Sequence, residues 1–235
     1  DNLTTRRGHE ERTVSASTYN RHYGTLRNLF GWLTRTEEIE ANPMDRVEKR
    51  RRGERLPRPM SPAHIETLFA RIDSARDRAL FSLLHGSGLR VSEALGLDIE
   101  DVNLEAREFR VVGKGDRERV GYITEDTVRH IRRYLRERGR PHIGPLFVSR
   151  HGTRLSYSMA WRLFRKYAEG LGSEDAPFTI HQLRHTFGSE RAGQVDALIL
   201  RDLMGHRSLR TTQQYAKVSP EATRKAFDAF ESAQR

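Results

Sequence analysis

The chain has 235 residues, with 42 lysines and arginines against 32 aspartates and glutamates, so its formal net charge is +10 at pH 7. This length allows one sizeable hydrophobic core and a smaller module. The absence of cysteine excludes disulfides and thiolate chemistry. No apolar run is long enough to cross a bilayer, and no signal-peptide pattern is present. The charge favours a polyanionic partner, nucleic acid before an anionic membrane, although a merely basic surface is the plain alternative.

The N-terminal part of the chain predicts a single long helix. The first dozen residues show no clear apolar period and are interpreted as a solvated lead-in or the tail of a preceding segment. From Ser17 onward the apolar residues repeat three or four apart, as on one face of a helix: Tyr19, Tyr23, Leu26, Phe30 and Leu33. The dipeptide Asn42-Pro43 ends this pattern, because a residue before proline avoids the helical region. Residues 1–46 are therefore predicted to be part of a helical module.

Residues 47–60 are basic, poor in apolar side chains and interrupted by glycine and proline, which predicts an interdomain linker. Its arginines Arg50, Arg51 and Arg52 are candidates for contacts with DNA phosphates. A solvated linker without such contacts is the alternative.

Residues 61–235 are predicted to form the larger domain, beginning at the helix N-cap Ser61-Pro62. An apolar helix over 79–84 precedes the glycine turn 86–88. Strands over 107–112 and 119–123 flank Gly113-Lys-Gly-Asp116, which predicts a β-hairpin. Further helices are expected over 124–138, 157–171, 179–192, 195–204, 208–215 and 220–232. The predicted fold class is mainly helical with a small antiparallel β-sheet (α+β).

Several polar residues of this domain carry side chains suited to phosphate chemistry: Arg90, Lys114, His181, Arg184, His206 and Tyr215. Singly, each has an ordinary structural explanation, as a surface charge, a hairpin tip or a packing residue. Their grouping says more, because His181 and Arg184 are three apart in a predicted helix and project from one face.

The segments around these residues resemble the sequence boxes of the tyrosine recombinases, also called the phage integrase family. Gly88-Leu-Arg-Val-Ser-Glu93 is similar to the family's first arginine box. The others follow in the family's order and approximate spacing: Lys114 in the hairpin, His181-Gln-Leu-Arg184, Leu203-Met-Gly-His206 and Tyr215. One short box carries little weight, but several in order make coincidence improbable. The resemblance covers residues 61–235, and residues 18–43 resemble the closing helix of the family's core-binding domain.

The chain departs from the family pattern in three places. The run from His181 to His206 is about one residue shorter than is common in the family. Gly188-Ser-Glu-Arg191 is more polar than the small and apolar residues usual there, which puts the local helix packing in question. The N-terminal module is also too short for the four or so helices that the family places there. We therefore expect upstream residues of a longer protein.

The resemblance implies that the phenol of Tyr215 attacks a DNA phosphodiester, forming a 3′-phosphotyrosine and releasing a 5′-hydroxyl. Arg90 and Arg184 would bind the non-bridging oxygens, since guanidinium is always charged and binds oxygen pairs, and His206 would donate a third hydrogen bond.

Two further groups are predicted to move protons. A free tyrosine has a pKa of about 10, so it needs a base, and His181 is the candidate because imidazole titrates near neutrality. Lys114 would protonate the leaving 5′-oxygen.

Glu93 is expected to orient Arg90 or His181 by a charge-assisted hydrogen bond, although a plain surface acid is nearly as good an interpretation. His185 is the other candidate for a supporting role. Neither a metal nor a cofactor is expected, because arginines replace the cation and phosphotyrosine preserves the energy of the broken bond.

The resemblance implies double-stranded DNA with specific recombination sites as partner, and a tetramer on DNA of this chain alone or with a related recombinase. The expected location is the cytoplasm of a bacterium or archaeon. Two alternatives stay open: a type IB topoisomerase, which shares this chemistry but only relaxes supercoils, and a non-catalytic DNA-binding accessory protein.

Overall fold

The computed structural model describes residues 4–7, 10–51, 58–113, 117–173, 176–206, 208, 211–212 and 215. The chain forms two compact units, residues 1–55 and 56–235, which are described separately. Within the described residues no helix is long and apolar enough to span a membrane.

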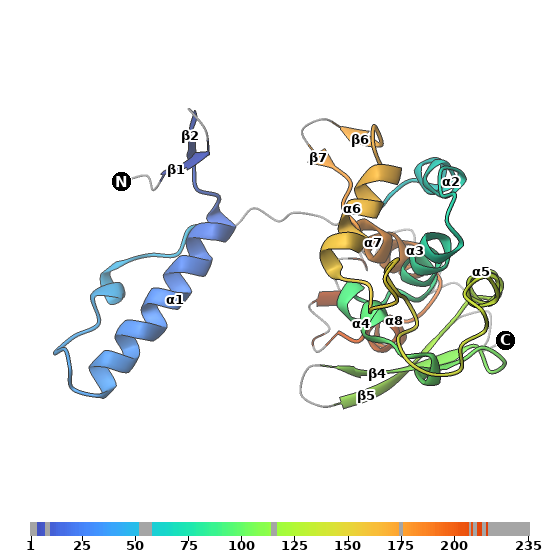
Figure 1. Ribbon diagram of the computed structural model, residues 1–235. Coiled ribbons are helices and arrows are strands. Elements are labelled where there is room, and N and C mark those ends of the chain that lie inside the picture. Colours follow the sequence, from blue (N-terminus) through green and yellow to red (C-terminus); the bar gives the residue numbers. More distant parts are fainter. Residues whose placement is uncertain are drawn as a thin grey trace, which may run out of the picture. The chain divides into compact units, whose positions relative to one another are not determined.

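The first unit is built on helix α1 (Ala16–Arg35), as the apolar period predicts (Figure 1). Ser15 caps it by accepting a hydrogen bond from the backbone N–H of Thr18 at 3.2 Å. The short 3₁₀ helix η1 (Pro43–Arg46) follows. Strands β1 (Thr4–Arg7) and β2 (Glu10–Thr13), which the sequence analysis did not predict, pair in antiparallel register before α1.

The first unit extends beyond residue 46 into the predicted linker. The side-chain amide of Asn20 on α1 donates to the backbone carbonyl of Arg50 at 2.8 Å, and its oxygen accepts from the Arg50 backbone N–H at 2.9 Å. The Arg50 guanidinium lies over the ring of Tyr19, 4.4 Å from its centroid. Arg51 is exposed, and Arg52 lies outside the described residues. The basic composition suggested a linker but did not reveal that its first residues pack along α1.

The second unit is mainly helical with a small sheet. Its helices are α2 (Pro62–Ala70), α3 (Ala75–Ser87), α4 (Val91–Gly96), α5 (Glu125–Glu137), α6 (Tyr157–Tyr167), α7 (His181–Arg191), α8 (Ala197–Met204) and the 3₁₀ helix η2 (Ile99–Asp101). Its strands are β3 (Val102–Asn103), β4 (Glu108–Gly113), β5 (Arg117–Tyr122), β6 (Gly172–Ser173) and β7 (Ala176–Pro177).

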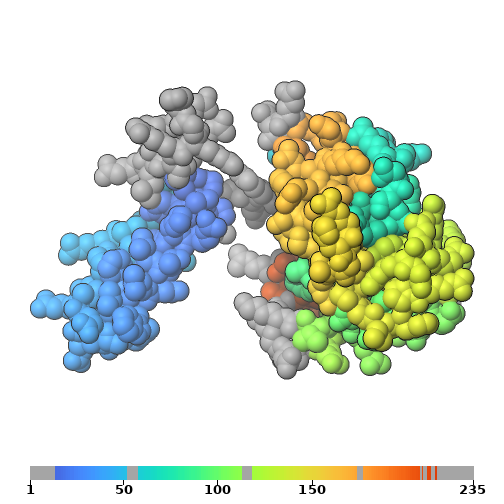
Figure 2. Space-filling view, in the orientation of Figure 1, coloured from blue at the N-terminus to red at the C-terminus, as the bar shows by residue number. Residues whose placement is uncertain are grey.

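Helix α3 lies at the centre of this unit and packs against α5 and α7 (Figure 1). Its apolar side chains are fully buried because neighbours surround it: Leu80, Phe81, Leu83 and Leu84. In Figure 2, side chains of α5 and α6 cover one face of the unit. The buried sides of these two helices bring Ile131 and Phe164 to the same core cluster.

The predicted hairpin is present and belongs to a three-stranded antiparallel sheet of order β3-β4-β5. Strands β4 and β5 pair from Glu108 with Tyr122 to Gly113 with Arg117. The two-residue β3 was not predicted, because so short a segment carries no period. Residues 114–116, and with them Lys114, lie outside the described residues.

Two helix predictions need adjustment. Helix α3 begins at Ala75, before the predicted residue 79, because its first turn is polar and is capped by Ser74. Helix α6 ends at Tyr167 rather than residue 171, since Gly170 and Gly172 adopt left-handed φ angles of 70° and 89°. The predicted helix over 220–232 lies outside the described residues, and of 208–215 only 208, 211–212 and 215 are described.

Candidate active site

The first arginine box is the turn that joins α3 to α4. Gly88 has a φ of 64°, and a Cβ on it would lie 2.4 Å from a ring atom of Phe187 on α7, so only glycine fits. This contact sets the turn directly against α7. Arg90 follows as the N-cap residue of α4.

Arg184 is buried on α7 beneath this turn. Its two terminal nitrogens donate to the carbonyls of Gly88 and Met204, the latter at 2.7 Å. Burial, with a smaller contribution from the nearby Arg90, lowers the pKa of Arg184 to about 10. The guanidinium therefore stays charged at neutral pH while its folded environment disfavours that charge. An anion bound beside the Arg184 guanidinium would offset the free-energy cost of burying its charge.

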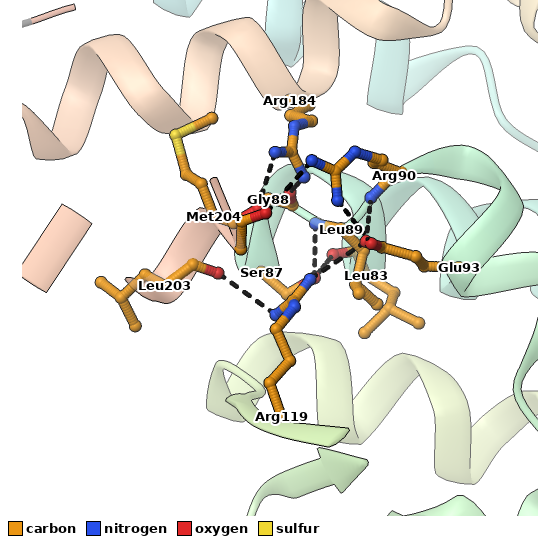
Figure 3. A network of polar contacts seen from close by, with 11 residues as sticks. Leu83, Ser87, Gly88, Leu89, Arg90, Glu93, Arg119, Arg184, Leu203 and Met204 are labelled. Carbon is orange, nitrogen blue, oxygen red and sulfur yellow. Dashed lines mark hydrogen bonds and ion pairs between the residues drawn. The ribbon is translucent and has the colours of Figure 1, made fainter. Parts of the chain in front are cut away.

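Glu93 holds two arginines together in the network shown in Figure 3. Its carboxylate accepts from the Arg90 backbone N–H at 2.9 Å and from the Arg90 guanidinium at 2.6 Å. The Arg119 guanidinium of β5 donates to it at 3.0 Å. Burial raises the pKa of Glu93, but the hydrogen bonds and charges of Arg90 and Arg119 outweigh it, so the net pKa lies below the usual range.

The guanidiniums of Arg90, Arg119 and Arg184 all donate to backbone carbonyls at the C-terminal end of α8. Three successive carbonyls accept from three arginines: Leu203 from Arg119 at 3.4 Å, Met204 from Arg184 at 2.7 Å and Gly205 from Arg90 at 3.1 Å. The last carbonyls of a helix lack intrahelical donors and carry partial negative charge, which explains why cations gather there. The three positive groups thus converge just before His206.

Arg119 was missed by the sequence analysis. It stands in a run of alternating charge, Arg117-Glu-Arg119, where nothing distinguishes one arginine from its neighbour. In the structure Arg119 differs from its neighbours because its guanidinium lies directly against Gly205. Gly205 adopts a φ of 61°, and a Cβ on it would lie 2.5 Å from the Arg119 Nε. Gly205 thus both ends α8 and leaves room for the guanidinium.

His206 follows this glycine and is half-buried. Its Nδ1 lies 3.0 Å from the hydroxyl oxygen of Thr212. Burial and the positive charges of Arg184, Arg90 and Arg119 lower the pKa of His206 to about 4, so the ring is neutral at pH 7.

Tyr215 lies between two imidazoles. Its hydroxyl is 2.7 Å from Nδ1 of His185, and its ring is nearly parallel to that of His206, with centroids 6.2 Å apart. A Cβ on Gly188 of α7 would lie 3.0 Å from the Tyr215 ring. Burial raises the pKa of Tyr215, while Arg184 opposes the shift by favouring the phenolate. The sequence prediction placed His185 only in a supporting role, yet it is the imidazole in contact with the phenol.

His181 lies at the start of α7 with an exposed side chain, and its ring makes no hydrogen bond to the described residues. Burial of part of the ring and the charge of Arg184 lower its pKa. The structure thus brings Arg90, Arg184, His206 and Tyr215 together, with Glu93 and His185 among them. Lys114 lies outside the described residues.

A hollow of about 690 Å³ is found elsewhere, between α6 and the β6–β7 hairpin, lined in part by Trp161, Arg165 and Phe178. It contains none of the arginines described above. Trp161 is partly exposed, with the Arg165 guanidinium 5.0 Å from its ring centroid. The arginine cluster is chemically suited to bind a tetrahedral oxyanion, because it gathers planar cations that form paired hydrogen bonds.

Replacing Glu93 with glutamine is expected to lower the free energy of unfolding by about 1–3 kcal/mol, because two guanidiniums lose a common acceptor in a poorly solvated position. Thermal unfolding measures this effect. The matched control is Glu105→Gln, since Glu105 pairs with Arg132 on the open surface and exposed pairs contribute about 0–1 kcal/mol. An equal loss of stability in the two variants would contradict the role of Glu93 as the common acceptor of the Arg90 and Arg119 guanidiniums.

Comparisons with known proteins identify the family. Residues 58–222 match the family model described as the phage integrase family. The tyrosine recombinase XerD of Lacticaseibacillus casei is 32% identical over 223 residues, which cover 90% of this chain and 75% of the relative. The tyrosine recombinase XerC of Haemophilus influenzae is 32% identical over 212 residues, covering 86% of this chain and 71% of the relative.

Solved structures share the fold at low identity. The Tn1549 transposon integrase in complex with a circular intermediate DNA aligns with a TM-score of 0.76 and 21% identity, covering 92% of this chain and 80% of that chain. XerH bound to a palindromic difH substrate aligns with a TM-score of 0.73 and 22% identity, covering 93% and 68%. The chain therefore belongs to the phage integrase family, the tyrosine recombinases, which are enzymes that cleave and rejoin DNA.

Proposed function

We propose that this chain recombines DNA at specific sites through a 3′-phosphotyrosine formed by Tyr215. The observation that carries the proposal is the adjacency of Arg184 and His185 on α7. Arg184 belongs to the arginine cluster, and His185 is hydrogen-bonded to the Tyr215 hydroxyl. A single turn of α7 therefore links the proposed phosphate-binding cluster to the proposed nucleophile.

The arginines are proposed to bind the scissile phosphate. Arg90 is partly exposed, and Arg184 lies beneath it. A phosphodiester repels nucleophiles, and its transition state carries added charge on the non-bridging oxygens. Guanidiniums already held by the α8 carbonyls are preorganised for that charge, so little reorganisation accompanies the reaction.

His206 is proposed to donate a hydrogen bond to the same phosphate. Its pKa of about 4 keeps the ring neutral at pH 7. With the Thr212 hydroxyl as donor to Nδ1, the single ring proton sits on Nε2 and is available to a phosphate oxygen. Lys114 remains the proposed donor to the leaving 5′-oxygen.

Double-stranded DNA is the proposed partner. The formal charge of +10 supports it, as do the printed descriptions of similar structures, which are DNA complexes of a transposon integrase and of XerH. Assembly into a tetramer on DNA, of this chain alone or with a related recombinase, and a cytoplasmic location in a bacterium or archaeon belong to the same proposal.

The proposal is tested in two steps. Covalent protein–DNA adducts are first captured from fragmented genomic DNA and sequenced, which gives the cleavage sites. A supercoiled plasmid with two such sites in direct repeat is then expected to give two smaller circles, whereas a one-site plasmid does not. Relaxation of any plasmid without dependence on paired sites would support the topoisomerase alternative instead. Binding without any adduct would support the accessory-protein alternative.

A further inference from the structure

Arg119 lies on the inner face of strand β5, between the exposed residues Glu118 and Val120. Its partner on β4 is Val111, which is buried. Because side chains alternate along a strand, this register turns Arg119 toward the rest of the unit, and only 16% of its side chain is exposed. The Arg119 guanidinium bridges two elements that lie far apart in the sequence, helix α4 and the end of α8.

Glu93 stands between Arg119 and Arg90 (Figure 3). Its Oε1 accepts from the Arg90 guanidinium at 2.6 Å, and its Oε2 accepts from the Arg119 guanidinium at 3.0 Å. The other terminal nitrogen of Arg119 donates to the Leu203 carbonyl at 3.4 Å. Arg119 therefore fixes the carboxylate that holds Arg90, and that carboxylate separates the two guanidiniums.

The charges explain why the second guanidinium matters. Burial raises the pKa of Glu93, but the hydrogen bonds and charges of Arg90 and Arg119 hold it below the usual range, so the carboxylate is ionised at pH 7. The Glu93 side chain is only 10% exposed, so water and salt screen its charge weakly. A carboxylate paired with Arg90 alone would compete with an incoming phosphate for that guanidinium and would repel the phosphate. Arg119 compensates the negative charge from the other side.

We propose that Arg119 is a positioning residue for DNA cleavage, which compensates the charge of Glu93 and so leaves the Arg90 guanidinium available to the scissile phosphate. This role rests on the proposed function, in which Arg90 binds that phosphate, and it requires no contact between Arg119 and DNA. Gly205 completes the arrangement, because a Cβ on it would lie 2.5 Å from the Arg119 Nε. Arg119 thus acts on Arg90 through Glu93 while it lies against the backbone that precedes His206.

The test measures single-turnover cleavage of a nicked DNA substrate by Arg119→Met and Arg119→Lys. Methionine keeps part of the apolar stem but removes the charge and both donors. We expect Arg119→Met to cleave about 10- to 100-fold more slowly, as a misplaced reacting group does. DNA affinity is expected to stay within a factor of about 3, because many phosphate contacts share it. Lysine restores the charge and one donor, so Arg119→Lys is expected to cleave faster than Arg119→Met.

Arg110→Met is the matched control. Arg110 is exposed on the adjacent strand β4, opposite Val120. Its replacement removes the same charge from the same sheet without changing the partners of Glu93. Cleavage by Arg110→Met is therefore expected to match the wild type.

A double-mutant cycle asks whether Arg119 acts through Glu93. Once residue 93 is an uncharged glutamine, no negative charge is left for Arg119 to compensate. We therefore expect Arg119→Met to slow cleavage by less than about 3-fold in the Glu93→Gln background, so the two substitutions are not additive.

A substrate with a methylphosphonate at the scissile position gives a second readout. It lacks the negative charge of the phosphodiester, so an uncompensated Glu93 does not repel it. We expect wild type and Arg119→Met to differ by less than about 3-fold on this substrate. A merely structural role would slow cleavage of both substrates by the same factor, and a smaller folded fraction cancels because one protein sample cleaves both.

Cleavage of the phosphodiester by Arg119→Met within about 3-fold of wild type would overturn the proposal. So would an undiminished loss in the Glu93→Gln background, equal slowing of the two substrates, or a comparable loss in Arg110→Met. Failure of the wild-type chain to form any adduct would instead contradict the proposed function, so the two failures are distinguishable.

Discussion

A Tyr215→Phe variant is expected to form no covalent adduct with DNA, because the substitution removes only the oxygen that would bond to phosphorus. The phenylalanine ring still fits over Gly188 and beside His206. The lost hydrogen bond to His185 is expected to change the free energy of unfolding by about 1 kcal/mol. DNA affinity is expected to stay within a factor of about 3, because phosphate contacts and not the phenol supply it.

The measurement pairs a denaturing gel with a binding assay on the same nicked substrate. Wild-type protein is expected to give a band that resists detergent and migrates as a protein–DNA conjugate, and Tyr215→Phe is expected to give none at equal occupancy. Tyr122→Phe is the matched control, because that tyrosine is exposed at the end of β5. A persistent adduct in Tyr215→Phe would show that another residue is the nucleophile.

Arg184→Lys is expected to reduce cleavage by about 10³-fold or more and also to destabilise the fold. Loss of one preorganised donor to a developing oxyanion costs about 10²- to 10³-fold. A single ammonium in this buried position also lacks the fork that bridges the carbonyls of Gly88 and Met204. A buried carbonyl left without a donor costs about 1–3 kcal/mol in the free energy of unfolding.

Arg90→Lys provides the comparison for Arg184→Lys. Both arginines are proposed to bind the scissile phosphate, but the Arg90 side chain is 44% exposed. Its replacement is expected to reduce cleavage strongly while the free energy of unfolding changes by less than about 1 kcal/mol, as for exposed ion pairs. Chemical denaturation and single-turnover cleavage separate the two effects. Arg184→Lys with wild-type stability would contradict the described bridging role.

The helices and the hairpin could be predicted because they depend on residues that are close together in the sequence. Apolar spacing and capping hydroxyl side chains (Ser15, Thr124 and Ser156) mark α1, α5 and α6, since the energies involved are those of neighbouring residues. The β1–β2 pair was missed because its residues carry no alternation of apolar and polar side chains. Two-residue strands such as β3 exist only through a partner strand, which no local pattern describes.

The site is predictable as a set of residues but not as a set of contacts. Arg90, Arg184, His206 and Tyr215 stand in boxes that the sequence displays. The hydrogen bonds of Arg90 and Arg184 to carbonyls at the end of α8 cannot be read from these boxes. A backbone carbonyl is present at every position, and only the tertiary fold decides which one is used. Arg119 was missed for the same reason.

The contact between His185 and Tyr215 shows a related limit. His181 and His185 lie on the same turn of α7 with the same side chain, and their spacing from Arg184 gives no reason to prefer the second. Which of the two histidines lies near the tyrosine depends on where residue 215 lies relative to α7, which is a long-range property. In the structure the helix presents His185 and Gly188 to the tyrosine, while His181 stays exposed at the first turn.

The most direct test of the account is to identify the residue that carries the DNA. A nicked substrate that loses its downstream strand traps the covalent complex, and nuclease and protease digestion followed by mass spectrometry locates the remaining nucleotide. We expect the modification on Tyr215, through a 3′-phosphate, with a free 5′-hydroxyl on the released strand. A nucleotide on any other residue, or a 5′-phosphate linkage, would contradict the central claim.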